Sequence, residues 1–290
     1  MITVVILNSA NGVYQNSLYG LVAAFPSQYT NAVVLGTNIC GTFVSIINII
    51  TLLVASDVKI AALLYFLISF LTILACFLSI FLLPKFEFYN FYMEKAKKRD
   101  EHNEVDGIKY IEAEVIPKID GVKLTAEGDK VEVLDSGFMA KLHLYYRIFK
   151  KVWIQCVNVW CVFFVTLALF PAVMADVKYS SKTGKYDFFI PEFLFTAFTT
   201  YLLFNFLAAL GSFLANFVQW PSAKWLVVPV VVRFAFIPLI MFCNYRPGFR
   251  TWGVLFDNVW VYILMASIMS ITSGYFSSLA MMYAPRYYPF

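Results

Sequence analysis

Residues 225–243 read WLVVPVVVRFAFIPLIMFC, an apolar stretch with one arginine, Arg233, at its centre. A membrane-spanning helix needs about 20 mainly apolar residues. A charge at the bilayer centre costs at least about 2.5–3.5 kcal/mol. Such a charge usually marks a polar path between helices. The stretch therefore predicts a spanning helix whose arginine faces other parts of the protein.

Six further stretches of the same kind surround this one. Lipid offers no partner for unpaired backbone groups, so each stretch is expected to be a helix. Of the 290 residues, 61% are apolar and only 14% are charged, against about 25% charged in a soluble domain. The sequence predicts an all-α polytopic membrane protein with seven transmembrane helices. The predicted spans are residues 1–25, 31–55, 59–83, 152–175, 189–218, 225–243 and 259–285.

The composition of the chain also argues against several kinds of partner and functional site. The net charge of +4 is too small and too scattered to indicate a nucleic-acid partner. The five cysteines lie in or beside apolar stretches, where packing is their expected role. The sequence has no Cys/His metal cluster, nucleophile triad or phosphate-cradling glycine loop. We therefore expect neither an enzyme nor a cofactor.

One long polar segment, 84–151, divides the predicted spans into two groups. Basic residues crowd both of its ends, which places it in the cytoplasm and the N-terminus outside. The short loops alone would favour the opposite orientation. The predicted organisation is a three-helix half bundle at 1–83, a cytoplasmic charged loop at 84–151, a four-helix half bundle at 152–285 and a tail at 286–290.

Within this loop, KFEFYNFYMEKAKKRD (85–100) predicts a helix leaving the membrane, aromatic first and then basic. A stop-transfer anchor is the favoured interpretation, and binding to anionic lipid is the other. Residues 105–135 show partial apolar–polar alternation. A small hairpin and a flexible linker are both compatible with that pattern.

Several amides lie inside the predicted spans. Asn8, Asn11 and Gln15 recur at helical spacing, so they share one face. Interhelical hydrogen bonds and a substrate-lining face are both open interpretations, as they are for Asn38. Asn205 and Ser212, seven residues apart, also face the same way. No Asp, Glu or His lies deep in any span, which favours passive movement of a solute over proton coupling.

Several motifs together resemble the equilibrative nucleoside transporter family. They cover nearly the whole chain apart from the charged loop. SLYGL (17–21), FPSQYT (25–30), FPAV (170–173), the QWPS turn (219–222) and the run from Arg233 to Pro238 carry most of the likeness.

The resemblance implies a facilitative nucleoside or nucleobase transporter that works by alternating access, most simply in the plasma membrane. The family has eleven helices in a fold like that of the major facilitator superfamily. The chain would match its fourth to tenth helices, forming a partial bundle that lacks the first three and the last. A truncated isoform or an internal fragment is therefore expected.

The resemblance also implies site residues. Gln15 falls where the family presents a glutamine to the nucleobase, while Phe170, Tyr201 and Asn205 fall on cavity-lining positions. Arg233 stands where the family has an arginine with a structural or gating role. With Asn38 and Ser212, these residues form the predicted substrate-binding set.

Two positions depart from the family pattern. Its eighth helix reads F-N-x-x-D-x-x-G-R, with the Asp and Arg holding ribose hydroxyls. Residues 204–212 read FNFLAALGS here, which puts Ala208 and Ser212 at those positions. Charge-assisted hydrogen bonds would be lost. A family member with altered substrate, or one that does not transport, is the alternative hypothesis.

Two other hypotheses follow from the helix count. A seven-helix receptor fits the number and orientation, but FLLPKFEFY (81–89) lacks the acidic–Arg–aromatic triplet of such receptors and 176–191 has no cysteine. A non-transporting fragment that associates with a full-length transporter fits the uncovered inner faces of an incomplete bundle.

Overall fold

The computed structural model describes residues 2–22, 25–54, 57–110, 134–179, 186–249 and 253–286. Within these ranges the chain is helical, with two isolated β-bridges and no strand. A helical membrane protein is therefore confirmed. Among the described residues, five helical runs are long and apolar enough to cross a bilayer, so the predicted count of seven spans remains a prediction. These runs are Gln28–Val54, Lys59–Lys85, Phe149–Ala175, Glu192–Leu214 and Val259–Ala284.

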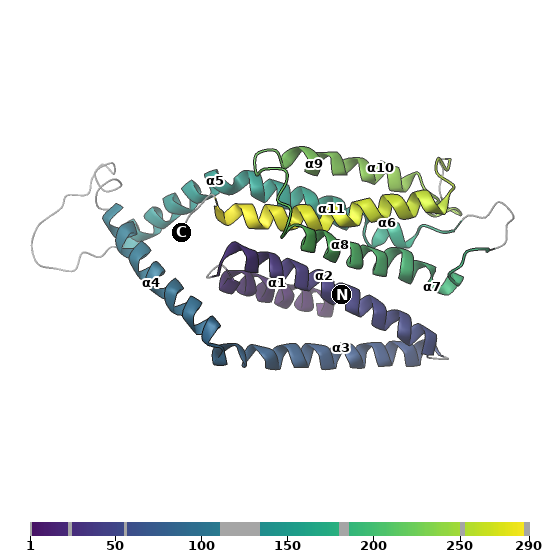
Figure 1. Cartoon of the computed structure of the whole chain (residues 1–290), viewed down its shortest axis with the longest axis horizontal. Coiled ribbons are helices and arrows are strands. Elements are labelled where there is room, and N and C mark those ends of the chain that lie inside the picture. Colours follow the sequence, from purple (N-terminus) through teal and green to yellow (C-terminus); the bar gives the residue numbers. More distant parts are fainter. Residues whose placement is uncertain are drawn as a thin grey trace, which may run out of the picture.

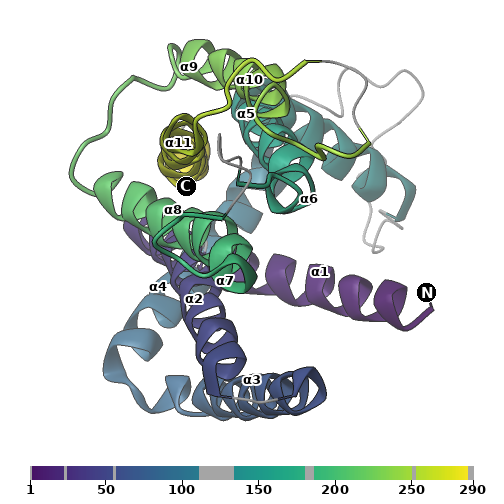
Figure 2. The same cartoon turned by 90° about the vertical axis from the view of Figure 1, so that its right-hand side faces the viewer.

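The first three helices are α1 (Ile2–Val22), α2 (Ser27–Val54) and α3 (Val58–Ile80). Helix α1 has no buried residue, and Figure 2 shows it leaving the side of the bundle. Helix α2 lies deeper, against the C-terminal part of the chain (Figure 1). Thus α2 makes the main contact between the two predicted half bundles.

The predicted charged loop begins and ends in helix. A short 3₁₀ turn, η1 (Leu83–Lys85), leads into α4 (Glu87–Tyr110), which confirms the helix predicted over 85–100. Residues 105–110 belong to this helix, so neither the hairpin nor the linker considered for 105–135 begins at 105. Residues 111–133 of that segment lie outside the described residues. Helix α5 (Leu134–Leu169) also begins well before the predicted start at 152.

Within the described residues, five helical segments lie between α5 and Arg233. They are α6 (Ala172–Ala175), α7 (Glu192–Thr196), the π-helical turn η4 (Ala197–Leu202), α8 (Leu203–Leu214) and α9 (Val227–Val232). The fifth predicted span is thus one continuous run from α7 through η4 to α8. Pro171 stands where α5 ends, as expected for a residue without a backbone N–H.

The stretch around Arg233 is a broken helix. After α9 come the 3₁₀ turn η5 (Arg233–Ala235) and α10 (Phe236–Met241). Pro238 cannot donate a hydrogen bond to the carbonyl of Phe234, which explains the change of helix type. From Val227 to Met241 the run is shorter than the five long ones.

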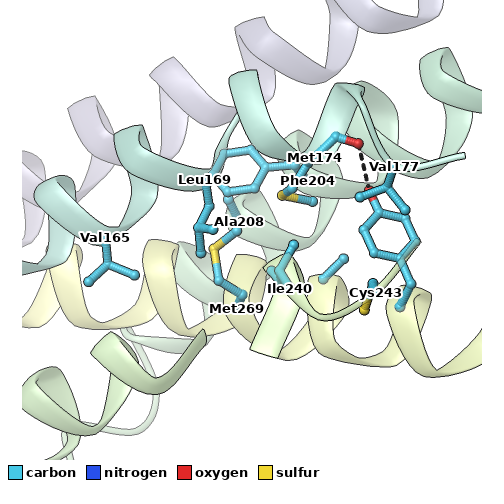
Figure 3. Close-up of a cluster of buried hydrophobic side chains, with 11 residues drawn as sticks. Val165, Leu169, Met174, Val177, Phe204, Ala208, Ile240, Cys243 and Met269 are labelled. Atoms are coloured by element: carbon cyan, nitrogen blue, oxygen red, sulfur yellow. Dashed lines mark hydrogen bonds between the residues drawn. The ribbon is translucent and has the colours of Figure 1, made fainter. Parts of the chain in front are cut away.

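Helix α11 (Val259–Arg286) lies between α8 and the α9–α10 pair (Figure 2). An apolar core lies where α11 meets α5 and α8 (Figure 3). It includes Leu169 of α5, Phe204 and Ala208 of α8, and Met269 of α11. A Cβ on Gly274 of α11 would collide with the carbonyl oxygen of Ala208. Close approach through small residues is typical of membrane helices. It holds α8 and α11 in direct backbone contact.

Candidate functional site

A row of polar side chains joins α2 to α8, and we call it the polar seam. Its α2 members recur every seven residues, which keeps them on one face of the helix. Its α8 members include Asn205 and Ser212, again seven apart. The polar seam consists of Asn31, Asn38 and Ser45 from α2, and Asn205, Ser212 and Asn216 from α8.

Asn31 forms the first rung of the polar seam. Its Nδ2 donates to the carbonyl oxygen of Ser212 at 3.0 Å and to Oδ1 of Asn216 at 2.7 Å. The side chain is fully buried, and its own Oδ1 has no hydrogen-bond partner. A buried polar atom without a partner costs about 1–3 kcal/mol. The side-chain amide of Asn31 therefore uses its donor group but not its acceptor oxygen.

Ser212 is the middle rung and connects three helices. Its Oγ accepts a hydrogen bond from Nδ2 of Asn38 at 2.9 Å and donates to the carbonyl oxygen of Gly274 at 3.2 Å. Ser212 is fully buried, whereas Asn38 is only partly buried. One hydroxyl thus links α2, α8 and α11.

Asn205 occupies the far rung. Its Nδ2 donates to the carbonyl oxygen of Tyr201 at 2.9 Å and, more weakly, to Oγ of Ser45 at 3.4 Å. The side-chain amide lies against Gly41 of α2, where any Cβ would overlap its Oδ1. The absence of a side chain at Gly41 allows this approach.

Three aromatic rings lie next to this rung. Phe170 stacks on Phe204 with ring centroids 3.9 Å apart and planes 13° apart. Tyr201 meets Phe170 edge to face at 5.9 Å. Since Tyr201 is one helical turn from Asn205, the aromatic group adjoins the polar seam. Flat faces beside amides form a combination that can stack on and hydrogen-bond a heteroaromatic ring.

The structure brings five of the seven predicted site residues into this region. They are Asn38, Phe170, Tyr201, Asn205 and Ser212. Gln15 lies apart, exposed on α1. Arg233 also lies apart, because α11 separates the α9–α10 pair from α8 (Figure 2).

Arg233 is 1% exposed and ties three segments together. Its Nη1 donates to the carbonyl oxygen of Val162 at 3.1 Å, and its Nη2 to Thr166 Oγ1 at 3.2 Å and the carbonyl oxygen of Met269 at 3.3 Å. The Nε atom is buried without a partner. Carbonyl dipoles and a hydroxyl, all from α5 and α11, therefore receive this guanidinium.

Ala208 and Ser212 are both sealed from solvent. Ala208 is 1% exposed, and its carbonyl oxygen closely approaches Gly274. Ser212 has both its side chain and its carbonyl engaged, as described above. Both residues therefore lie in the contact between α8 and α11.

Sequence reasoning overlooked Asn31, Ser45 and Phe204 as members of this region. The signal for the first two was their spacing, since Asn31 lies seven residues before Asn38 and Ser45 seven after it. Asn31 is the first residue of the predicted span 31–55, and its place at the end of that span did not single it out as a contact between helices. Among the described residues, no group of three or more His, Cys, Asp or Glu side chains could hold a metal ion.

Comparisons with known proteins are consistent across the chain. A family model described as nucleoside transporter matches residues 1–289. The chain is 28% identical to equilibrative nucleoside transporter 1 of Homo sapiens, over 99% of this chain and 61% of that protein. It is 28% identical to equilibrative nucleoside transporter 2 of Homo sapiens, over 99% of this chain and 64% of that protein. It is 26% identical to equilibrative nucleoside transporter 3 of Rattus norvegicus, over 100% of this chain and 58% of that protein. The chain thus spans roughly three fifths of the length of these relatives.

Proposed function

The chain belongs to the nucleoside transporter family, and we propose that it acts as a facilitative carrier of nucleosides or nucleobases. Family membership confirms the resemblance seen in the sequence. With its apolar helices, it also makes the chain an integral multi-pass membrane protein. The plasma membrane is the proposed location. The solute and the mechanism are proposals built on the geometry of the polar seam.

The proposed mechanism is alternating access, in which two helix bundles rock around a central site. The two bundles are the proposed halves 1–83 and 152–285. The observation that supports this mechanism is that the polar seam links these halves through neutral amides and hydroxyls. Each such bond contributes about 0.5–1.5 kcal/mol net, so the contact is specific yet can be broken reversibly.

The proposed solute site lies where the polar seam meets the aromatic group. Asn38 and Asn205 would hydrogen-bond the edges of a base, and Phe170 and Tyr201 would stack on its faces. Gln15 would join them when α1 packs against this region, because α1 presents it on an exposed face here. Arg233 would act through the packing of α5, α10 and α11 rather than by touching the solute.

A second candidate is a family member with altered substrate or without transport. Ala208 and Ser212 offer no charge to ribose hydroxyls, and both are closed off by α11. This favours the base over the sugar as the recognised group. It predicts that uracil or adenine competes for uptake about as well as uridine or adenosine.

Association with further transporter helices is the proposed partnership. Asn11, Gln15 and Asn16 are exposed on α1, and no helix in the described part of the chain buries them. Unpaired amides in hydrocarbon are costly. A full-length transporter could supply helices that bond to this face.

Uptake into proteoliposomes tests these proposals. Purified chain is reconstituted, and entry of labelled uridine, adenosine and uracil is followed with and without a proton gradient. Equal rates with and without the gradient support a facilitative carrier, and strong dependence on it contradicts one. Uptake that needs a co-reconstituted full-length transporter would favour the associating, non-transporting alternative.

A further inference from the structure

A cavity lies on the other side of α11 from the polar seam. Its volume is about 660 Å³, within the range of about 300–1,000 Å³ typical of ligand pockets. The α9–α10 run forms one wall and α11 the other, with the turn before α9 at one end. The lining is Trp220, Pro221, Ser222, Trp225, Val228, Pro229, Val232, Arg233, Phe236, Ile268, Thr272 and Phe276.

The walls of this groove are apolar and accessible from the side of the helices. Val228, Val232 and Ile268 are all exposed, although each is a large aliphatic side chain. These residues belong to the predicted sixth span and to a helix long and apolar enough to cross a bilayer. In a membrane they face hydrocarbon rather than water. An acyl chain is therefore the natural occupant of the groove.

The mouth of the groove has the chemistry of a membrane interface. Trp220 and Trp225 line it and are 75% and 68% exposed. Tryptophan is enriched at the level of lipid headgroups. The turn that carries Trp220 is fixed by two tyrosines of α11. The hydroxyl of Tyr275 donates to the carbonyl oxygen of Val218 at 3.0 Å, and that of Tyr283 to the carbonyl oxygen of Pro221 at 3.0 Å.

The charge at this mouth is positive. Lys224 is exposed and lies between Ser222 and Trp225, both of which line the groove. Nε2 of Gln155 donates to the carbonyl oxygen of Ala223 at 2.9 Å, which brings α5 beside the same turn. Residues 215–249 contain no acidic residue that could offset the charge of Lys224.

We propose that this groove binds one acyl chain of an anionic glycerophospholipid, with the phosphate held at Lys224 between Trp220 and Trp225. Basic groups beside a membrane attract anionic headgroups. The occupant fills the space between the α9–α10 run and α11. Such a lipid would stabilise the position of Arg233 relative to α11. This proposal depends on the membrane setting and not on the solute that is carried.

Fluorescence quenching tests the proposal directly. The full chain is reconstituted in nanodiscs of phosphatidylcholine that contain either brominated phosphatidylglycerol or brominated phosphatidylcholine. Quenching that disappears in the double variant W220F/W225F is assigned to the groove. We expect brominated phosphatidylglycerol to be favoured about fivefold at these two positions, which is the effect of one basic residue near a membrane surface.

Two variants separate the headgroup from the acyl chain. Lys224→Gln should abolish the preference for phosphatidylglycerol, whereas Lys178→Gln, an exposed lysine on the loop after α6, should preserve it. Thr272→Phe places a ring inside the groove and should reduce quenching by both lipids. A variant is used in this comparison only if it elutes as a folded species and its melting temperature is unchanged. Equal quenching by the two lipids in the unmodified chain would overturn the proposal. So would a preference unaffected by Lys224→Gln, or quenching unaffected by Thr272→Phe.

Discussion

Nδ2 of Asn31 donates a hydrogen bond to the carbonyl oxygen of Ser212 at 3.0 Å, across 181 residues of sequence. The bond ties the start of α2 to the end of α8. Two residues before Asn31, the ring of Tyr29 lies 5.5 Å from that of Phe88 in α4. The first rung of the polar seam therefore lies next to the point where the chain leaves the bundle for α4.

Replacing Asn31 tests how much this rung contributes to the stability of the fold. Asn31→Ala removes two hydrogen bonds, so we expect the free energy of unfolding to fall by about 1–3 kcal/mol. Asn16→Ala is the matched control, because Asn16 is an exposed amide on α1. It should change stability by less than about 0.5 kcal/mol. Thermal unfolding in detergent measures both. Equal effects of the two substitutions would show that the bonds to Ser212 and Asn216 contribute nothing.

Cross-linking the first rung tests alternating access. In the double variant Asn31→Cys/Asn216→Cys, a short bifunctional thiol reagent should join α2 to α8 and block uptake. A reducing agent that cleaves the reagent should restore it. The single variants, treated in the same way, control for the five native cysteines. Full uptake by the cross-linked protein would mean that the polar seam need not open during transport.

Gly41 offers a test of close packing at the far rung. Gly41→Ala forces a methyl group into the amide of Asn205, and we expect a loss of about 1–3 kcal/mol from overpacking. Gly36→Ala on the same helix meets no atom within 4 Å and should be neutral or stabilising. Adding Asn205→Ala to Gly41→Ala should recover part of the loss. If the two glycine variants melt at the same temperature, α2 and α8 do not meet as described.

Arg233 can be tested with a conservative replacement. Lysine keeps the charge but lacks the fork of donors that reaches Val162, Thr166 and Met269 together. We expect Arg233→Lys to lower stability by about 1–3 kcal/mol. Arg246→Lys is the control, since Arg246 is exposed and pairs with Asp176 on the surface. Circular dichroism during heating follows both variants. If the Arg233→Lys protein were as stable as the original, the separate hydrogen bonds of the guanidinium would contribute nothing to stability, and only the positive charge would matter.

The sequence predicted where the helices lie better than it predicted which helices pack against each other. Length and hydropathy predicted α2, α3 and α11 closely. Prediction was weaker before α5, where helix begins at Leu134 in a segment whose charge indicated a loop. In the candidate site, periodicity placed Asn205 and Ser212 on one face. It did not indicate that Asn31 and Asn38 lie opposite them.

By itself, the sequence determined that this is a helical membrane protein, because long apolar runs in a bilayer can satisfy their backbone groups only as helices. It also determined that Asn205 and Ser212 share one face of their helix. Only the tertiary structure decided that α2 pairs with α8, that α11 screens Arg233 from the polar seam, and that α1 stands apart. The physical reason is that periodicity orients a side chain around its own helix. The identity of the opposing helix depends on close contacts at small residues such as Gly41 and Gly274, which are set by packing in three dimensions.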